Sequence, residues 1–284
     1  MRFGVHLRPT EYAIDIRELA RAVEAAGFES LWVSEHSHIP TSLESTWPGG
    51  EGLPRFMTHF LDPFVALAAA ASVTRSIRLG TGICLVLQRD TIHLAKQVAT
   101  LDHLSKGRFI FGIGAGWNVE EMRNHGIDPA RRWKRMREQV LAMKAIWTQN
   151  EAAFHGTEID FDPIWQWPKP ARQPHPPVLV GGEGPTVLQR VIDYGDGWLP
   201  NDHQELHSRM DELRLLAGEA GRDVPPVTVF AVDHDPSVLE AHLQAGVERC
   251  VFNLPTAPAD EVLPVLDRLA TLAGLTPTPQ PASG

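Results

Sequence analysis

Short apolar runs alternate with amphipathic segments along almost the whole chain. Eight of these runs have the length and composition of strands, and a segment with helical periodicity follows each one. Strict alternation favours parallel pairing through right-handed crossovers. With eight units in 284 residues, the α/β chain fits a closed (β/α)8 TIM barrel better than an open doubly wound sheet. We expect the strands over residues 3–7, 28–33, 77–86, 108–113, 178–180, 197–199, 227–232 and 249–253.

Two long stretches interrupt this alternation. Residues 37–61, after the second strand, are rich in Pro, Gly, Ser and Thr, and connections of this length are usually functional or disordered. Residues 148–177, before the fifth strand, carry turn signals and predict a β-hairpin over the barrel mouth or on the subunit surface. We expect one barrel domain over residues 1–273 with these two insertions, followed by a Pro-rich tail over 274–284.

Composition narrows the classes of partner. The formal charge of −9 argues against nucleic acid or an anionic membrane. The longest apolar run, 64–73, is too short to span a bilayer. The first strand starts at Phe3, which leaves no room for a signal peptide, and Cys84 and Cys250 lie in apolar runs typical of buried thiols. We therefore expect a soluble protein of the cytoplasm.

The fourth strand runs into a Gly-rich turn and a helix start. The turn Gly112-Ile113-Gly114-Ala115-Gly116 resembles a dinucleotide fingerprint, but that motif requires its third glycine where Trp117 stands. The glycines suit either a flat, bulky ligand or close packing of helix on strand. Asn118 is a good N-cap, and Glu121 three residues later predicts a capping box.

Other candidates lie where strands end, because the active site of this fold is built there. His36 titrates in the range for acid/base work. Glu35 beside it either orients it, contacts a ligand or is a strand-end carboxylate that faces the next helix. The turn 181–184 offers amides to a phosphate at a helix start, with Pro185 in the first helical position. Asp202, with Glu205 three residues on, predicts the cap of the next helix.

A metal site is the alternative use of the histidines. His36 and His38 alternate at a strand end, and His203 and His207 stand four residues apart. No carboxylate or lysine is evident at the strand ends where such a site needs one, so we assign no metal ligand.

Taken together, these segments resemble the luciferase-like monooxygenase superfamily, particularly its coenzyme F420-dependent oxidoreductases. The resemblance covers residues 1 to about 270, and it lies in the order and spacing of short motifs. The matching segments are 32–36, 79–83, 107–118, 132–138, 154–156, 167–170, 177–182 and 195–198.

The resemblance implies a barrel that holds F420, or alternatively FMN, at the carboxyl ends of its strands. It makes His36 the cofactor-facing acid/base residue, with Glu35 beside it. Gly82 and Ile83 resemble a strand bulge under the cofactor ring that often contains a non-prolyl cis peptide. The remaining residues expected at the cofactor are Gly114, Gly116, Gly181, Gly182, Glu183 and Gly184.

We expect Trp117 and His6 to line the substrate pocket. Sugar-phosphate dehydrogenases of this family carry a glutamate where Trp117 stands, which favours a more apolar substrate. The resulting hypothesis is hydride transfer between F420 and a small organic molecule. The alternatives are an FMNH2-dependent monooxygenase that uses O2, a metal-dependent barrel hydrolase and a non-catalytic barrel. Homodimers are common in the resembling family, and the apolar second and third helices are the expected contacts.

Overall fold

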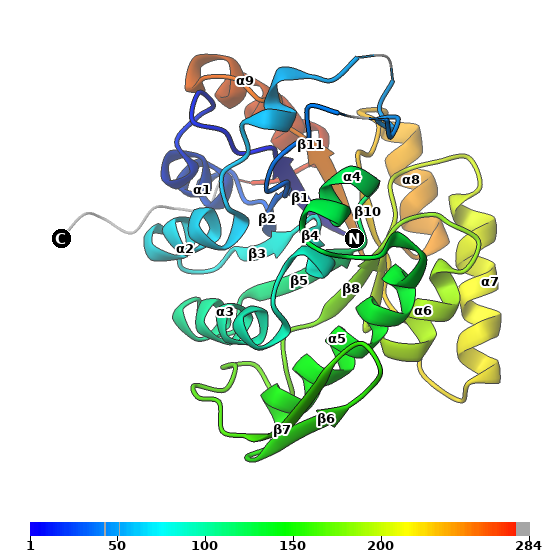
Figure 1. Cartoon of the computed structure of the whole chain (residues 1–284). Helices are drawn as coiled ribbons and strands as arrows, with labels where there is room; N and C mark the ends of the chain where they lie inside the picture. Colours follow the sequence, from blue (N-terminus) through cyan, green and yellow to red (C-terminus); the bar gives the residue numbers. More distant parts are fainter. Residues whose placement is uncertain (43, 51, 277–284) are drawn as a thin grey trace.

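Parallel strands form a barrel with helices around it, as the alternation predicts (Figure 1). The computed structural model describes residues 1–42, 44–50 and 52–276. Within them the barrel strands are β1 (Arg2–Leu7), β2 (Ser30–Val33), β3 (Arg78–Thr81), β5 (Phe109–Gly114), β8 (Val178–Gly181), β9 (Gly197–Leu199), β10 (Thr228–Phe230) and β11 (Arg249–Asn253). Parallel pairing runs from β10 through β11 and β1 round to β9. Isolated parallel bridges between β9 and β10 complete the ring, at Trp198–Val227 and Asn201–Phe230.

The helices cover the outside of the barrel, and most begin where the sequence predicts. They are α1 (Ile16–Ala25), α2 (Pro63–Val73), α3 (Thr91–Leu104), α4 (Val119–Asn124), α5 (Arg132–Thr148), α6 (Val187–Tyr194), α7 (Leu206–Glu219), α8 (Pro236–Ala245) and α9 (Ala259–Leu272). Short 3-10 turns lie at η1 (Arg55–Thr58), η2 (Val86–Gln88) and η3 (Pro129–Arg131). Asp62 caps α2 by accepting hydrogen bonds from the backbone of Phe64 and Val65.

Two of the expected helix starts are wrong. α6 begins two residues after Pro185, because Val187 first closes a turn onto the carbonyl of Gly184. α7 begins at Leu206 without a side-chain cap, and the carboxylate of Asp202 instead lies 3.1 Å from Nε2 of His242. A buried partner on a neighbouring helix therefore replaces the local cap.

The expected third strand is split. It becomes β3 and a short β4 (Cys84–Leu85), which pairs with β5, and the break falls at Gly82–Ile83. The peptide bond between Gly82 and Ile83 is cis, as the resemblance implied. A Cβ on Gly82 would lie 2.4 Å from the ring of Phe230, so only glycine fits at this step.

The barrel interior is filled by its own small apolar cluster. Trp32, Ile110, Leu179, Leu199, Phe230 and Val251 are buried there, separate from the larger core between sheet and helices. Trp32 needs the room left by a glycine, since a Cβ on Gly80 would lie 2.2 Å from its ring. The filled interior leaves the carboxyl ends of the strands as the floor of any site.

The two insertions lie in different places. The described residues of the first insertion, 37–42, 44–50 and 52–61, lie at the top of Figure 1 and supply η1. The second insertion contains the predicted hairpin, antiparallel strands β6 (Ala152–His155) and β7 (Asp160–Ile164). It packs beside α5, where the Glu138 carboxylate accepts from the backbone of Glu158 and Ile159, so it belongs to the subunit surface and not to the barrel mouth.

The barrel domain extends beyond residue 273, where the sequence predicts its end. Leu275 donates a backbone hydrogen bond to Ala270 and packs against the core, so residues 274–276 are not a free tail. The rest of the expected tail, 277–284, lies outside the described residues. Cys84 and Cys250 are buried free thiols, as predicted. In the part of the chain that the structure describes, no helix is long and apolar enough to cross a membrane.

Candidate functional site

A cleft with two lobes opens at the carboxyl ends of the strands. One lobe, of about 290 Å³, contains His36 and is named here the His36 lobe; the other, of about 280 Å³, contains Gly182 and is named the Gly182 lobe. They share the residues of one ridge, so they form a continuous cleft. The shared residues are Gly82, Ile83, Gly116, Trp117, Asn201 and Phe230.

The ridge depends on glycines that make room for Ile83. A Cβ on Gly114 would lie 2.0 Å from Cδ1 of Ile83, and a Cβ on Gly181 would lie 2.9 Å from its Cγ2. Gly114 lines the Gly182 lobe, and its missing side chain also seats Ile83, which faces both lobes. Gly116, with φ of +82°, lines both lobes itself.

The Gly182 lobe is suited to an anion. Gly182 has φ of +111° and no heavy atom within 4 Å of a Cβ built on it, so a ligand can approach its backbone. α6 begins nearby at Val187 without a side-chain cap. The Val187 amide bonds the carbonyl of Gly184, and the amides that follow it in the first turn have no side-chain partner and can bind negative charge. Arg190 lies 3.9 Å above the ring of Trp133, a residue of the lobe wall, and its buried Nε has no partner among the described residues.

The rest of the expected phosphate turn does not line either lobe. The carboxylate of Glu183 accepts from the backbone and side-chain nitrogens of Asn201, and so joins the end of β8 to the end of β9. The carbonyl of Gly184 accepts from Arg209. The structure thus brings Gly181 and Gly182 to the cleft and gives Glu183 and Gly184 a supporting position behind it.

His36 is held at the mouth by a carboxylate from α4. Its Nδ1 lies 2.7 Å from Oε2 of Glu121, and Trp117 donates from Nε1 to its Nε2 at 3.2 Å. This arrangement puts the proton on Nδ1, and the lone pair of Nε2 accepts the hydrogen bond from Trp117. Burial by itself would raise the pKa of Glu121, but the hydrogen bond from His36 and the attraction of its protonated form outweigh burial, and the pKa lies below its ordinary value.

The predicted capping box is therefore only half right. Asn118 accepts from the backbone of Glu121 at 2.9 Å, as an N-cap should. The carboxylate of Glu121 turns the other way, towards His36 and the backbone of Ser37. A residue assigned to local helix geometry is in fact the partner of the candidate acid/base.

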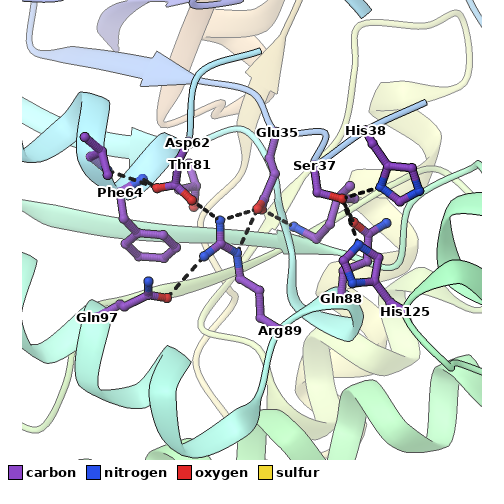
Figure 2. Close-up of polar contacts among 12 residues, drawn as sticks. Glu35, Ser37, His38, Asp62, Phe64, Thr81, Gln88, Arg89, Gln97 and His125 are labelled. Carbon is purple, nitrogen blue, oxygen red and sulfur yellow. Dashed lines mark hydrogen bonds and ion pairs between the residues drawn. The ribbon is translucent and has the colours of Figure 1, made fainter. Parts of the chain in front are cut away.

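Glu35, expected beside His36, contributes to the wall of the His36 lobe, but its carboxylate is bound by other partners. Figure 2 shows its carboxylate in contact with Arg89, which also donates to Asp62 at 2.7 Å and to Gln97 at 3.2 Å. The other oxygen of Glu35 accepts from the backbone of Leu85 in β4. These contacts fix the strand that follows Ile83, so the geometry supports a structural role for Glu35 and leaves the orientation of His36 to Glu121.

His6 lies in the wall of the His36 lobe and is locked between two polar partners. Its Nδ1 lies 2.8 Å from Oδ1 of Asn253, and its Nε2 lies 2.5 Å from Oγ of Ser34. Burial, and then the positive charge of Arg8, lower the pKa of His6 to about 3. His6 is therefore neutral at physiological pH and shapes the pocket without carrying charge.

Aromatic side chains from the first insertion close the His36 lobe. Trp47, Phe56 and Phe60 line it, opposite Trp117 from the β5–α4 turn. Such walls favour an apolar ligand and reduce contact with water. The expectation of an apolar pocket around Trp117 agrees with this geometry.

The histidines of the metal alternative point to different partners. His38 contacts Ser37 and Asn124, and His207 contacts His242. Among residues 1–42, 44–50 and 52–276, no three His, Cys, Asp or Glu side chains lie close enough together to hold a metal ion.

Some cleft residues carry no sequence signal that points to a site. Arg8 and Asn253 stand at the ends of β1 and β11, and Asn201 and Phe230 at the ends of β9 and β10. Only their positions at strand ends single them out. Glu121 has a signal, but the same spacing also fits a helix cap.

Comparisons with known proteins agree on the family. The luciferase-like monooxygenase family matches residues 1–264. An uncharacterized protein of Mycobacterium tuberculosis, Rv0953c, is 39% identical over 277 residues, which cover 95% of this chain and 98% of the relative.

Other relatives have named activities. The F420-dependent hydroxymycolic acid dehydrogenase of M. tuberculosis is 28% identical over 72% of this chain and 54% of its own length. The FMNH2-dependent dimethylsulfone monooxygenase of Pseudomonas putida is 30% identical over 50% of this chain and 40% of its own length.

Solved structures agree on the fold. An F420-dependent secondary alcohol dehydrogenase, in complex with an F420-acetone adduct, superposes with a TM-score of 0.71 at 17% identity. The match covers 95% of this chain and 97% of that one. At this identity the similarity shows that the two chains share a barrel.

The low pKa of His6 predicts a pH-dependent stability. In the unfolded chain His6 takes up a proton as the pH falls below the ordinary pKa of 6.5, but in the folded protein it does so only near its pKa of about 3. The folded protein therefore loses stability as the pH falls from 6.5 towards 3. The loss is about 1.4 kcal/mol per pH unit. His6→Gln lacks this contribution. We expect the free energy of unfolding, measured with urea, to differ most from wild type at pH 7, and the difference to shrink towards pH 4. His155→Gln, at an exposed histidine, is the control, and parallel curves for wild type and His6→Gln would contradict the prediction.

Proposed function

Since the chain belongs to the luciferase-like monooxygenase family, whose members are oxidoreductases, we propose that it transfers a hydride between coenzyme F420 and a small organic substrate. The observation that carries the proposal is the two-lobed cleft. One lobe contains Gly182, close in sequence to the uncapped start of α6, and the other contains a histidine among aromatic side chains. A cofactor with a phosphate at one end and a flat ring at the other fits this division.

The residues present fit such a cofactor. Gly182 and the start of α6 would hold the phosphate, because open space and free amides occur there together. Ile83, seated on Gly114 and Gly181, would support the ring on the ridge between the lobes. When bound, F420 supplies a hydride donor or acceptor at C5 of its deazaflavin.

The protein would manage the proton that accompanies the hydride. Nε2 of His36 accepts a hydrogen bond from Trp117, so a substrate hydroxyl that takes the place of Trp117 there would give its proton to Nε2, which returns it once protonated. Glu121 holds the ring in this orientation through Nδ1 and stabilises the imidazolium. Trp47, Phe56 and Phe60 exclude water from the same space.

FMN is the rival cofactor. Both cofactors combine a flat tricyclic ring with a phosphate, and relatives of this chain use one or the other. The F420-dependent dehydrogenase aligns over a larger share of this chain than the FMNH2-dependent monooxygenase, which supports F420. An FMNH2-dependent monooxygenase is the second candidate function.

Cofactor titration tests the proposal directly. We expect purified protein to bind F420 with micromolar affinity and FMN at least tenfold more weakly, followed by the fluorescence of each cofactor. Tighter binding of FMN would favour the monooxygenase. No binding of either would favour a barrel without cofactor chemistry.

His36 and Glu121 predict a graded loss of turnover. We expect His36→Ala to lower kcat by about 100-fold or more, the usual contribution of a general acid or base. F420 affinity should stay within about threefold, since the imidazole only faces the ring. Glu121→Gln keeps a hydrogen-bond acceptor but loses the charge, so we expect a smaller loss of about tenfold. Turnover is followed as the change in F420 absorbance with a panel of small alcohols and ketones.

His155→Ala is the matched control for these variants. It breaks a histidine–carboxylate pair of 2.8 Å with Asp160 in the β6–β7 hairpin, away from the cleft. Its kcat should equal that of wild type. Unchanged turnover in His36→Ala would reject the acid/base role.

We further propose that the protein forms a homodimer through an apolar α2–α3 face. This face contains Val65 (71% exposed), Leu61 (40%), Ile92 (36%) and Trp167 (58%), and Trp167 is tied to α3 by a hydrogen bond from Lys96 to its carbonyl. Exposed apolar side chains that gather in this way mark an interaction site.

Light scattering after gel filtration tests the dimer. We expect a dimer mass for wild type and a monomer mass for Val65→Asp, because a charge would be buried at the interface. Leu215→Asp on α7 is the control, since Leu215 is equally exposed (70%) but lies elsewhere. A monomeric wild type, or a dimeric Val65→Asp, would reject this interface.

A further inference from the structure

Arg8 brings an uncompensated positive charge into the His36 lobe. It directly follows β1 and lines the lobe, and its guanidinium carbon lies 4.9 Å from the centre of the Phe56 ring. Apart from this stacking, its side chain has no hydrogen bond or ion pair with any residue that the structure describes. Burial lowers the pKa of Arg8, which shows how far the guanidinium is removed from water.

The carboxylates around the cleft are already engaged by other partners. Glu35 pairs with Arg89, and Glu121 pairs with His36. Asp202, at the rim beyond Asn253, pairs with His242. Removing a guanidinium from water without a partner costs free energy. A bound anion would offset that cost by pairing with the guanidinium.

The polar groups next to Arg8 carry no negative charge. Asn253 uses its carbonyl oxygen on His6, which leaves its amide nitrogen without a partner among the described residues. His6 itself is neutral, because its pKa is about 3. A planar anion at this place would therefore meet the guanidinium fork and an amide donor, which suits a carboxylate.

We propose that Arg8 binds the carboxylate of the substrate, and that the substrate is a small carboxylic acid with an apolar body. The aromatic walls of the lobe would hold the apolar body, with its reacting carbon towards His36. This inference rests on the proposed function for its reaction, but the anion site itself needs no cofactor. Arg8 acts here as a determinant of specificity.

The alternative is that Arg8 only holds Phe56 over the lobe by stacking. The two roles differ in what they do to charged and neutral ligands. A stacking role would change the affinity for both kinds of ligand alike. An anchoring role would change the affinity for the acid alone.

Calorimetric titration of the cofactor-free protein with benzoate and with benzyl alcohol distinguishes these roles. We expect wild type to bind benzoate at least tenfold more tightly than benzyl alcohol. Arg8→Met keeps an apolar stem for Phe56, and should lose this preference while its affinity for benzyl alcohol stays within about threefold. Arg8→Lys keeps the charge without the fork, and should retain part of the preference.

Arg55→Met is the matched control. Arg55 lies beside Phe56 in the first insertion and stacks on Tyr12 at 4.3 Å, but it does not line the lobe, so its variant should keep the wild-type preference. The inference would be overturned by a wild type that does not favour benzoate, by an Arg8→Met protein that still does, or by an equal loss of both ligands.

Titration with F420 on the same preparations separates this inference from the proposed function. A preference for benzoate that depends on Arg8, in a protein that binds no F420, would support the acid site and reject the F420 reaction. F420 binding without any preference for benzoate would support the F420 reaction and reject the acid site.

Discussion

The close contact between Ile83 and two glycines determines the shape of the cleft. Ile83 occupies the space that side chains at Gly114 and Gly181 would fill, and Gly82 before it lies against Phe230. These four partners come from β5, β8, the β3–β4 break and β10, so the ridge exists only when the barrel is closed. The ridge divides the mouth into a lobe with free amides and a lobe with His36. Each part of the proposed function depends on that division.

Charge pairing around the ridge decides which groups remain available. Arg89 binds both Glu35 and Asp62 (Figure 2). The carboxylate of Glu35, although adjacent to His36 in the sequence, is therefore not available to His36. Glu121 then becomes the partner of His36. With these carboxylates engaged, Arg8 is left facing the aromatic lobe, which is the physical basis for expecting an acidic substrate.

Much of the architecture follows from local patterns. The strand and helix alternation and the hairpin in 148–177 each depend on a few neighbouring residues, and each is found. The errors fall on polar side chains with more than one possible partner. Asp202 and Glu121 both stand where they could cap or close a helix start, but buried histidines at longer range bind them instead. A buried histidine gains more from a carboxylate than a solvated helix end does.

The sequence by itself therefore determined the barrel, the family and the glycines of the ridge, because periodicity and backbone freedom are properties of short segments. It also placed His36, Gly82, Ile83, Gly181 and Gly182 at strand ends, where the cleft forms. Only the tertiary structure decided that Glu121 and not Glu35 holds His36, that Gly114 makes room for Ile83, and that Arg8 has no counter-charge among the described residues. These outcomes depend on which side chains come into contact when the ring of strands closes. His36 and Glu121 are 85 positions apart, so no local sequence pattern predicts their contact.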